Sequence, residues 1–515
     1  MLWCSRVVWA LAVFPLGWLS FETIQSVDAK KRPPKEAAVA TPVAVPGTAA
    51  HPAALPFLEN DFPTAKKRAQ ERKQWLFAEA WAPWCHTCLS MRNFVFPDPV
   101  LAPLADRMVY LAVDTENPTN REFLANFPVS VWPTLLVIAP GEAGKSEAAD
   151  TVVARFEGAL SAPKLFASLS ALLAKEDPGQ TQLVAAEHLL SLGKTAQAAQ
   201  AFAALVAEPK SGAQALVGWV KSLGRLGDFE TCVAVHERHF AQAGKTALAT
   251  DFASYVARCV AQIPDVDRRH KLARQLRQDL EKLVLDRAAD LSVDDRSDGY
   301  GTMIELSDAM GDKQMGDEIT LQRLALLERA AGAAKTPTES ATFDAHRFDG
   351  YRRLRRWPVA LEMLLGTEKA LPDDYNVKAR LARLHYETGE FELALAKIEQ
   401  ALALAAGPRR ANLFELRAAI QSGQGQLRAA LDSLRAAKAI VAASGVSKRG
   451  KDLEEQIARL EKQVPAPPTV PGPQFAVPAT QPAVPATQLA TETQRGKPTG
   501  KPSRRLAKRN AGSMK

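Results

Sequence analysis

The stretch Trp81-Ala82-Pro83-Trp84-Cys85-His86-Thr87-Cys88 decides the fold of the first folded region. Residues 75–81 are apolar and aromatic enough to form a buried strand, and residues 89–96 can continue as a helix. This order places Cys85 at a helix N-terminus. Unpaired backbone N–H groups and the positive end of the helix dipole stabilise a thiolate at that position.

Two cysteines at this spacing can close a small disulfide or open to a dithiol. The thiolate is the form that attacks other disulfides, so the chemistry needs one exposed, acidified cysteine, which is Cys85. Cys88 lies one turn farther along the helix, where it can resolve the mixed disulfide. The spacing therefore predicts a redox-active Cys85–Cys88 disulfide.

Further strands and helices are expected on both sides of this pair. A charged helix is predicted at residues 60–73, before the first strand. The turn at residues 140–144 makes an antiparallel hairpin of the last two strands. The remaining strands are expected at 108–113, 134–138 and 152–156, and the remaining helices at 117–126 and 161–175.

This order, with Trp-Cys-x-x-Cys after the first core strand, resembles the thioredoxin family over residues 57–175. The run from Cys88 through Phe96-Pro97-Asp98-Pro99-Val100, with Asp114 and Phe127-Pro128-Val129, resembles the C-terminal domain of membrane thiol:disulfide interchange reductases. The pair His86-Thr87 departs from the Gly-Pro of ordinary thioredoxin. That departure bears on the redox potential and on the direction of exchange, not on the chemistry.

The resemblance implies roles for two residues outside the pair. Glu79, six residues before Cys85, falls where the family has a buried acid below the resolving cysteine, and Pro133 falls where it has a cis-proline facing the dithiol. Burial raises the pKa of a carboxyl group, so Glu79 could accept the Cys88 proton near neutral pH. A salt-bridged strand residue is the alternative for Glu79. A cis-proline would shape the edge on which a substrate strand docks.

Other residues are expected to frame the site. His86 could stabilise the Cys85 thiolate when it is protonated, or it could be a solvated residue at the helix start. A zinc site is not expected, because the sequence has no second Cys-x-x-Cys and no histidine pair at ligand spacing. We therefore expect neither a metal nor an organic cofactor. The framing residues are Trp84, His86, Thr87 and Trp132.

The N-terminal residues predict export. Residues 1–29 contain one arginine, then an apolar run at 7–21, then Val27-Asp28-Ala29, which together resemble a secretory signal peptide. An uncleaved membrane anchor is the alternative, but this run is shorter than the roughly 20 residues that span a bilayer. Export to the periplasm or cell envelope would place the cysteines where disulfides persist. Residues 30–56, rich in Ala and Pro, are expected to be an extended linker.

A change of composition predicts an all-α region at residues 180–463. Residues near Gly193 recur 34 positions later near Gly227, and residues near Arg355 recur 34 positions later near Gly389. The pattern resembles tetratricopeptide repeats, a solenoid that would bind a protein partner. We expect helices also where the repeat degenerates, with an irregular loop near 290–301. Small residues at the helix crossings are Ala198, Ala360, Ala394 and Ala430.

Two cysteines and two histidines lie within this helical region. Cys232 takes a small-residue position of the repeat, so we expect a buried free thiol rather than a disulfide with Cys259. His236 and His239 are three residues apart and could share a metal. Each also takes a packing position of the repeat, which we favour.

The C-terminal residues 464–515 are expected to be a disordered tail rich in Pro, Ala and Thr. From Arg495 to Lys515 there are eight Lys or Arg and no acid, which equals the formal net charge of +8 for the whole chain. This basic end would adhere to an anionic envelope surface. No specific nucleic-acid partner is expected.

These features predict a multidomain protein, with an α/β thioredoxin-like domain at 57–176 and a tetratricopeptide-like solenoid after it. The expected function is exchange of disulfides with protein substrates through Cys85 and Cys88, in an exported oxidoreductase. An alternative is an envelope adaptor, in which the solenoid binds the partner and the thioredoxin-like domain is a regulatory docking module.

Overall fold

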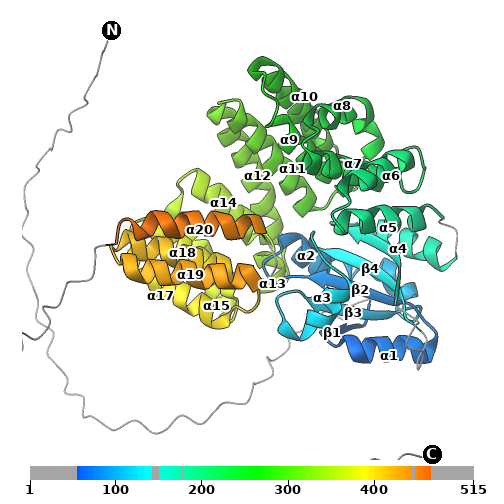
Figure 1. Cartoon of the computed structure of the whole chain (residues 1–515), viewed down its shortest axis with the longest axis horizontal. Helices are drawn as coiled ribbons and strands as arrows, with labels where there is room; N and C mark the ends of the chain where they lie inside the picture. Colours follow the sequence, from blue (N-terminus) through cyan, green and yellow to red (C-terminus); the bar gives the residue numbers. More distant parts are fainter. Residues whose placement is uncertain (1–54, 142–149, 175–177, 444–446, 465–515) are drawn as a thin grey trace, which may run out of the picture.

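The computed structural model describes residues 55–141, 150–174, 178–443 and 447–464. A sheet domain comes first and a long run of helices follows it (Figure 1). The expected signal peptide, and nearly all of the expected linker and basic tail, lie outside the described residues. Among the helices described, none is long and apolar enough to cross a membrane.

A five-stranded mixed sheet forms the N-terminal domain, with the strand order β1-β3-β2-β4-β5. The central strand β2 is parallel to β3 and antiparallel to β4. β4 and β5 form the predicted antiparallel hairpin. The three inner strands are buried on both faces, which explains their nearly continuous apolar sequences. The strands are β1 (Phe57–Glu59), β2 (Leu76–Trp81), β3 (Val109–Asp114), β4 (Thr134–Ala139) and β5 (Thr151–Glu157).

Helices cover both faces of the sheet. On one face Phe62 of α1 and Phe123 of α3 belong to an apolar layer with the sheet residue Leu111. On the other face Met91 of the π-helical segment η1 and Leu165 of α4 pack in a second layer. The order of strands and helices confirms the predicted fold, with β1 added at the edge. These helices are α1 (Phe62–Arg72), α2 (His86–Ser90), η1 (Met91–Val95), η2 (Pro99–Leu104), η3 (Pro118–Asn120), α3 (Arg121–Asn126) and α4 (Ala162–Leu173).

The helices after residue 178 form the predicted solenoid, in which consecutive helices pack against one another. They are α5 (Pro178–Ser191), α6 (Thr195–Leu205), α7 (Gly212–Leu226), α8 (Phe229–His239), η4 (Phe240–Ala243), α9 (Ala247–Val260), α10 (Val266–Leu285), α11 (Val293–Ala309), α12 (Lys313–Ala333), α13 (Pro337–Ala341), α14 (Asp344–Arg353), α15 (Trp357–Ala370), α16 (Tyr375–Glu387), α17 (Phe391–Leu404), α18 (Arg410–Gly423), α19 (Leu427–Ala443) and α20 (Ser447–Glu461).

Glycine and alanine explain the spacing of the repeat. Gly227 after α7 and Gly389 after α16 have φ angles of 76° and 81°, a left-handed conformation that ends a helix and favours glycine. The alanines predicted at helix crossings are buried completely, which is consistent with close approach of two helices there. These alanines are Ala198, Ala360, Ala394 and Ala430.

The prediction of an irregular loop at residues 290–301 is wrong. Helix α11 already begins at Val293, and Ser292 and Asp295 form a capping box at its start. Gly299 is required by the close approach of α10, because a Cβ there would lie 2.5 Å from Cγ1 of Val284.

The prediction of a free thiol at Cys232 is also wrong. Cys232 on α8 and Cys259 on α9 form a disulfide, with their Cα atoms 6.3 Å apart. This Cα distance is within the range that a disulfide spans. The small-residue position at a helix crossing was predicted correctly for burial, but the neighbouring helix places a second cysteine at the same crossing. A tertiary contact of this kind has no signature in the local sequence.

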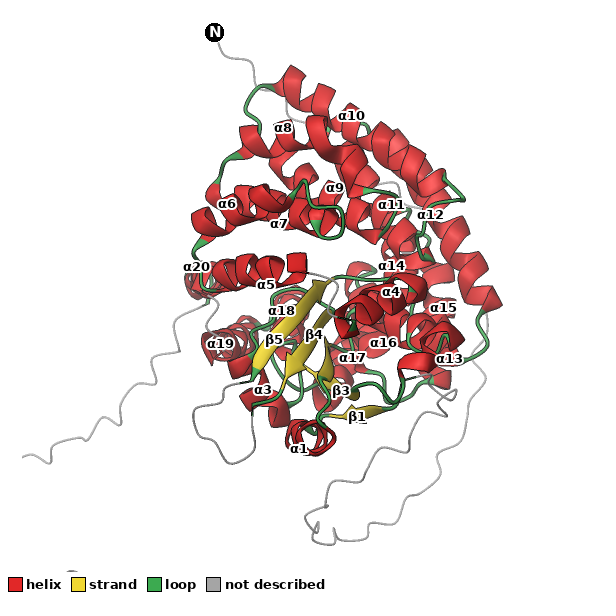
Figure 2. Ribbon diagram, turned by 90° about the vertical axis from the view of Figure 1, so that its right-hand side faces the viewer, coloured by secondary structure: helices red, strands yellow, loops and turns green. Residues whose placement is uncertain are grey.

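The solenoid curves around the sheet domain and contacts it repeatedly (Figure 2). α5 packs against β5, α11 against α2, and α13 against η1. Farther along the chain, Gly407 lies so close to Glu116 that a Cβ would lie 2.5 Å from the Glu116 carbonyl oxygen. The solenoid therefore touches the sheet domain around the Cys85–Cys88 turn, which positions groups from distant repeats beside it.

Candidate active site

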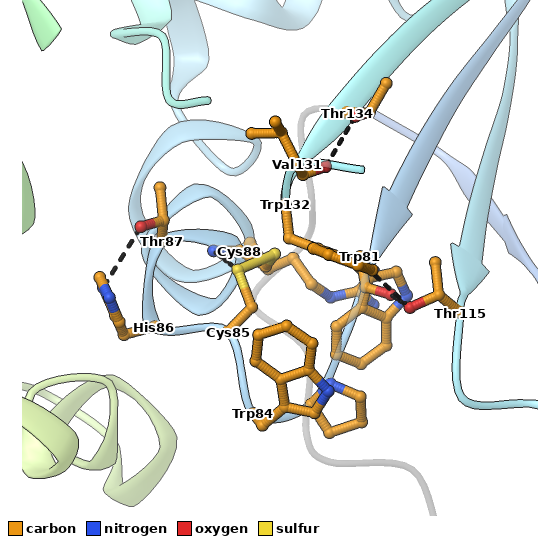
Figure 3. The surroundings of a disulfide bond; sticks show 12 residues. Trp81, Trp84, Cys85, His86, Thr87, Cys88, Thr115, Val131, Trp132 and Thr134 are labelled. Atoms are coloured by element: carbon orange, nitrogen blue, oxygen red, sulfur yellow. Dashed lines mark hydrogen bonds between the residues drawn. A yellow bond between two sulfur atoms is a disulfide. The ribbon is translucent and has the colours of Figure 1, made fainter. Parts of the chain in front are cut away.

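The two cysteines of the turn form a disulfide at the start of α2. Cys85 is the N-cap of this helix, and its Sγ accepts a hydrogen bond from the Cys88 backbone N–H at 3.0 Å (Figure 3). α2 continues directly into η1, so the helical run extends through Val95. After reduction the same N–H would stabilise a thiolate on Cys85.

The sulfur of Cys85 is less accessible than the sequence predicted. Cys85 is 5% exposed and Cys88 is fully buried. Three tryptophans pack against the pair, and the indole rings of Trp84 and Trp132 lie with centroids 5.2 Å apart (Figure 3). The third tryptophan is Trp81. The prediction of an exposed Cys85 is therefore wrong, because tryptophan side chains enclose this residue.

Hydrogen bonds hold two of these tryptophan side chains in place. Trp84 Nε1 donates to Glu116 Oε1 at 2.9 Å, and Trp132 Nε1 donates to Thr115 Oγ1 at 2.9 Å. Both acceptors follow the carboxyl end of β3. The indoles are thus oriented by the sheet, which fixes the width of the space around the disulfide.

The peptide bond between Trp132 and Pro133 is cis. Pro133 is buried immediately before β4, and its carbonyl oxygen accepts the Gly158 N–H at 2.9 Å. Thr134 Oγ1 donates to the Val131 carbonyl at 2.7 Å. These bonds fix the loop that carries Trp132 against the cysteine pair.

Glu79 is fully buried on β2 and has one hydrogen-bonded and one orphaned oxygen. Its Oε2 accepts from Arg92 at 3.1 Å, while Oε1 has no partner among the described protein atoms. Burial raises the pKa of Glu79 to about 7, against the opposing influence of Arg92. The salt-bridged interpretation of Glu79 therefore holds, while its transfer of a proton with Cys88 stays a prediction that the raised pKa supports.

Arg92 connects Glu79 to the surface beside the site. Its guanidinium lies 4.1 Å from the ring centroid of Trp81 and donates to Glu59 at 2.6 Å. Arg92 follows Cys88 by four residues in the helical run, so it lies on the same side as the resolving cysteine. This arginine was not among the residues that the sequence singled out.

His86 is held by the solenoid and is not a solvated residue. Its Nδ1 lies 2.9 and 3.0 Å from the two carboxylate oxygens of Asp294 on α11, and Thr87 Oγ1 lies 3.2 Å from the same nitrogen. Burial opposes the charged ring, but Asp294 and Asp298 outweigh it and raise the pKa of His86 to about 9. His86 is therefore an imidazolium at neutral pH.

A second group of polar residues from the solenoid surrounds His86. His346 on α14 lies with its ring centroid 3.9 Å from that of His86. Ser297 Oγ lies 2.7 Å from His346 Nδ1 and accepts from Arg323 Nε at 2.8 Å. Sequence reasoning missed this group, because Asp294 follows His86 by 208 residues. Only the capping pattern at the start of α11 could have indicated a helix there.

Donor atoms of His86, Asp294 and His346 lie within 4.8 Å of one another, close enough for a metal site. The Nδ1 atoms of both rings already have hydrogen-bond partners, in Asp294 and Ser297. The positive charges of His86 and Arg323 also balance the nearby carboxylates. We therefore describe the group as a hydrogen-bonded cluster.

The solenoid also holds the other side of the turn. Asn376 Nδ2 donates to the Pro83 carbonyl at 3.1 Å. The guanidinium of Arg409 lies 5.0 Å from the centroid of Trp84, and its backbone N–H donates to Glu116 at 2.8 Å. The solenoid thus contacts the cysteine turn through α11 on one side, and through α16 and the start of α18 on the other.

A polar cavity of about 1010 Å³ opens on the solenoid beside the His86 cluster. Asp298, Arg323 and His346 line it and belong to that cluster, while Arg258 and Trp357 line more distant parts. All the residues that line the cavity come from the solenoid, and Asp298 and His346 connect it to the His86 cluster.

The histidine pair on α8 does not share a site. His236 is buried beside Phe240 and Phe252, and its Nε2 lies 3.4 Å from Asp279. His239 Nδ1 is hydrogen-bonded to Gln242 instead. The packing interpretation of the sequence therefore fits the surroundings of His236.

This geometry agrees with comparisons to known proteins. Residues 58–140 match the family described as thioredoxin-like. A thiol:disulfide interchange protein DsbD of Pseudomonas fluorescens is 36% identical over 74 residues, which are 14% of this chain and 13% of that protein. DsbD 2 of Pseudomonas aeruginosa is 35% identical over 115 residues, 21% of this chain and 19% of that protein. The chain spans less than a fifth of these curated relatives.

Two solved structures show a distant likeness to this chain. A tetratricopeptide repeat protein from Parabacteroides merdae has a TM-score of 0.36 and 14% identity, and the match covers 55% of this chain and 97% of that one. BtubC from P. vanneervenii has a TM-score of 0.30 and 15% identity, and the match covers 44% of this chain and 92% of that one.

Proposed function

We propose that this protein is an exported thiol-disulfide oxidoreductase that exchanges disulfides with protein substrates. The observation that carries the proposal is a Cys85–Cys88 disulfide at a helix start, with the fully buried Glu79 on the preceding strand and a cis bond before Pro133. The match to thioredoxin-like proteins over residues 58–140 supports it.

In the direction that reduces a substrate disulfide, the proposed reaction has two steps. The Cys85 thiolate attacks one sulfur of a substrate disulfide, forming a mixed disulfide and releasing the other substrate sulfur as a thiolate. Cys88 then loses its proton to Glu79 and attacks Cys85 Sγ, which closes the Cys85–Cys88 disulfide and releases the second substrate thiolate. Two electrons pass from the dithiol to the substrate. The reverse sequence oxidises a substrate dithiol.

The proposal of export draws support from the second disulfide. Cys232 and Cys259 are joined in the core of the solenoid, and such bonds persist outside the reducing cytosol. The apolar run at residues 7–21 fits the same compartment. In this setting the basic C-terminal residues would bind an anionic envelope surface, and the polar cavity of the solenoid would receive the protein substrate.

The test uses the full chain with the dithiol reduced. We expect turnover in insulin reduction with wild-type protein, and none with Cys85→Ala. Cys88→Ala should accumulate mixed disulfides, because the resolving thiol is missing. Trapped proteins would then identify the substrates. A folded wild-type protein without turnover, and a Cys88→Ala variant without adducts, would contradict the proposal.

The enclosure of Cys85 favours a second candidate function. A cysteine that is 5% exposed, in a turn held by helices of the solenoid, fits a regulatory module whose redox state changes how the helices bind a partner. In that case the reduced and oxidised proteins would differ in partner affinity, while insulin would not be turned over. The same assay therefore separates the two candidates.

A further inference from the structure

The ring of His86 lies between two carboxylates of one helix. Its Nδ1 is 2.9 Å from Asp294, and its Nε2 is 3.9 Å from Asp298. Asp294 and Asp298 are four residues apart on α11, so they lie on the same face of that helix. An imidazolium, which has an N–H on both nitrogens, is the form of His86 that this arrangement satisfies.

The neighbours of this ring are arranged for a single positive charge on it. Arg323 donates to Ser297 Oγ, which leaves the Ser297 hydroxyl proton for Nδ1 of His346. His346 is then neutral, with its Nε2–H facing Asp298 at 3.5 Å. Burial and the adjacent His86 hold the pKa of His346 well below its usual range, in agreement with that assignment.

Asp294 lies in the first turn of α11 and is 1% exposed. Its hydrogen bond to His86 is therefore shielded from water and from salt. The charge on His86, which is the residue directly after Cys85, depends on a helix of the solenoid.

We propose that Asp294 is a positioning residue for the dithiol: it holds His86 charged at the first residue of the helix that Cys85 caps, so that docking of the solenoid makes the Cys85–Cys88 disulfide more oxidising. This inference rests on the proposed function and names its regulation. A cation in the first turn of this helix favours the Cys85 thiolate of the reduced form, and so favours reduction of the disulfide. Loss of the cation shifts the equilibrium toward the disulfide.

The equilibrium with glutathione measures this effect on the full chain. Two glutathione thiols are oxidised to one glutathione disulfide while Cys85–Cys88 is reduced, so two electrons are exchanged. Asp294→Asn should lower the equilibrium constant for reduction about tenfold, which is a fall of ~30 mV in the reduction potential. His86→Asn should lower it by a similar factor, since its amide preserves a donor without the charge.

Two further variants separate this role from a general effect on docking. Asp290→Asn removes another carboxylate contact between the domains, the 2.6 Å bond from Ser161, and should leave the potential unchanged. The double variant Asp294→Asn/His86→Asn should shift the potential no more than His86→Asn alone, because Asp294 acts through His86. Asp294→Glu should restore most of the wild-type value.

Several results would overturn the inference. An Asp294→Asn protein with the wild-type potential would do so, as would an equal shift in Asp290→Asn. If Asp294→Asn does not fold, the potential of His86→Asn tests the inference. An unchanged reduction potential in that variant would show that the charge of His86 does not affect the Cys85–Cys88 disulfide. Binding of one equivalent of Zn²⁺ that is lost in His86→Asn would assign the ring to a metal instead. Wild-type protein that equilibrates with glutathione but does not reduce insulin contradicts the proposed function alone.

Discussion

The two disulfides in the described part of the chain are both buried, but their surroundings differ. Cys85 and Cys88 are three residues apart in a turn, beside the charged groups of Glu79 and the His86 cluster. Cys232 and Cys259 are 27 residues apart and join two helices within an apolar cluster of the solenoid. Burial alone therefore does not distinguish a redox pair from a structural one. The titratable groups around the sulfurs make the difference.

The largest expected effect separates the two bonds by activity. Cys85→Ala should reduce insulin turnover to the uncatalysed background, because the attacking sulfur is lost. The double variant Cys232→Ser/Cys259→Ser, assayed below its melting temperature, should retain turnover. Loss of activity in the double variant, with its fold intact by circular dichroism, would contradict the proposal that only the Cys85–Cys88 pair is needed for turnover.

The two disulfides should rank in the opposite order for stability, with the Cys232–Cys259 bond contributing more than the Cys85–Cys88 bond. In the chain-entropy description a bond across 27 residues stabilises the fold by about 3.5 kcal/mol, and one across three residues by about 2 kcal/mol. Chemical denaturation of Cys232→Ser/Cys259→Ser and of Cys85→Ser/Cys88→Ser should show this order. Equal losses would mean that the unfolded chain is not constrained in the way assumed.

Glu79 should affect only the redox pair. Glu79→Gln should slow resolution of the mixed disulfide about 100-fold, a barrier increase of ~2.7 kcal/mol, and leave the first attack nearly unchanged. Because folding raises the pKa of this carboxyl from 4.5 to about 7, wild-type stability should fall as the pH rises through that interval. Glu79→Gln should lack this decrease. Stopped-flow quenching and denaturation against pH measure the two effects, and a slowed first step would contradict the assigned role.

The charge of His86 should be visible as pH-dependent stability. Its pKa rises from 6.5 to about 9 on folding, so its contribution is complete below pH 6.5 and is lost as the pH rises through 9. A hydrogen bond to a charged group of this kind contributes about 2 kcal/mol. The stability difference between wild type and His86→Asn should therefore shrink between pH 7 and 10. A constant difference would argue for an uncharged ring.

The smallest expected effect concerns the repeat position that Cys232 shares with alanines elsewhere. Ala394→Leu should overpack the crossing of its helices at a cost of ~1–2 kcal/mol, since Ala394 has no exposed surface. Thermal melting of the solenoid measures this cost, with exposed Leu393→Ala as the matched control. Unchanged melting of Ala394→Leu would count against the repeat register.

The sequence predicted what local patterns encode. The apolar strands, the Cys-x-x-Cys turn and the β4–β5 hairpin were all expected from residues adjacent in the chain. β1 was missed, because three residues at a sheet edge are too short to show a period. These strands fix the position of Glu79 and of Pro133, so the core of the candidate site could be anticipated.

The rest of the site depends on contacts between distant segments. Asp294 contacts His86 across 208 residues, and its helix begins within the segment that was expected to be an irregular loop. Whether Cys232 bonds to Cys259 could not be decided without the crossing of α8 and α9. The solvated alternative for His86 failed for the same reason, since no local pattern reports which surface will cover a residue.

The close approach of Gly407 to Glu116 has a consequence for the order of events during synthesis. Arg409, which follows that glycine and binds Glu116, comes 293 residues after it. A ribosome adding ~5–20 residues per second reaches Arg409 on the order of 15–60 s after Glu116. A nascent sheet domain that folds at once lacks the contacts of Arg409 with Glu116 and Trp84 throughout that interval. The Trp84 side of the cysteine turn is therefore secured late in the life of each chain, only after most of the solenoid has been made.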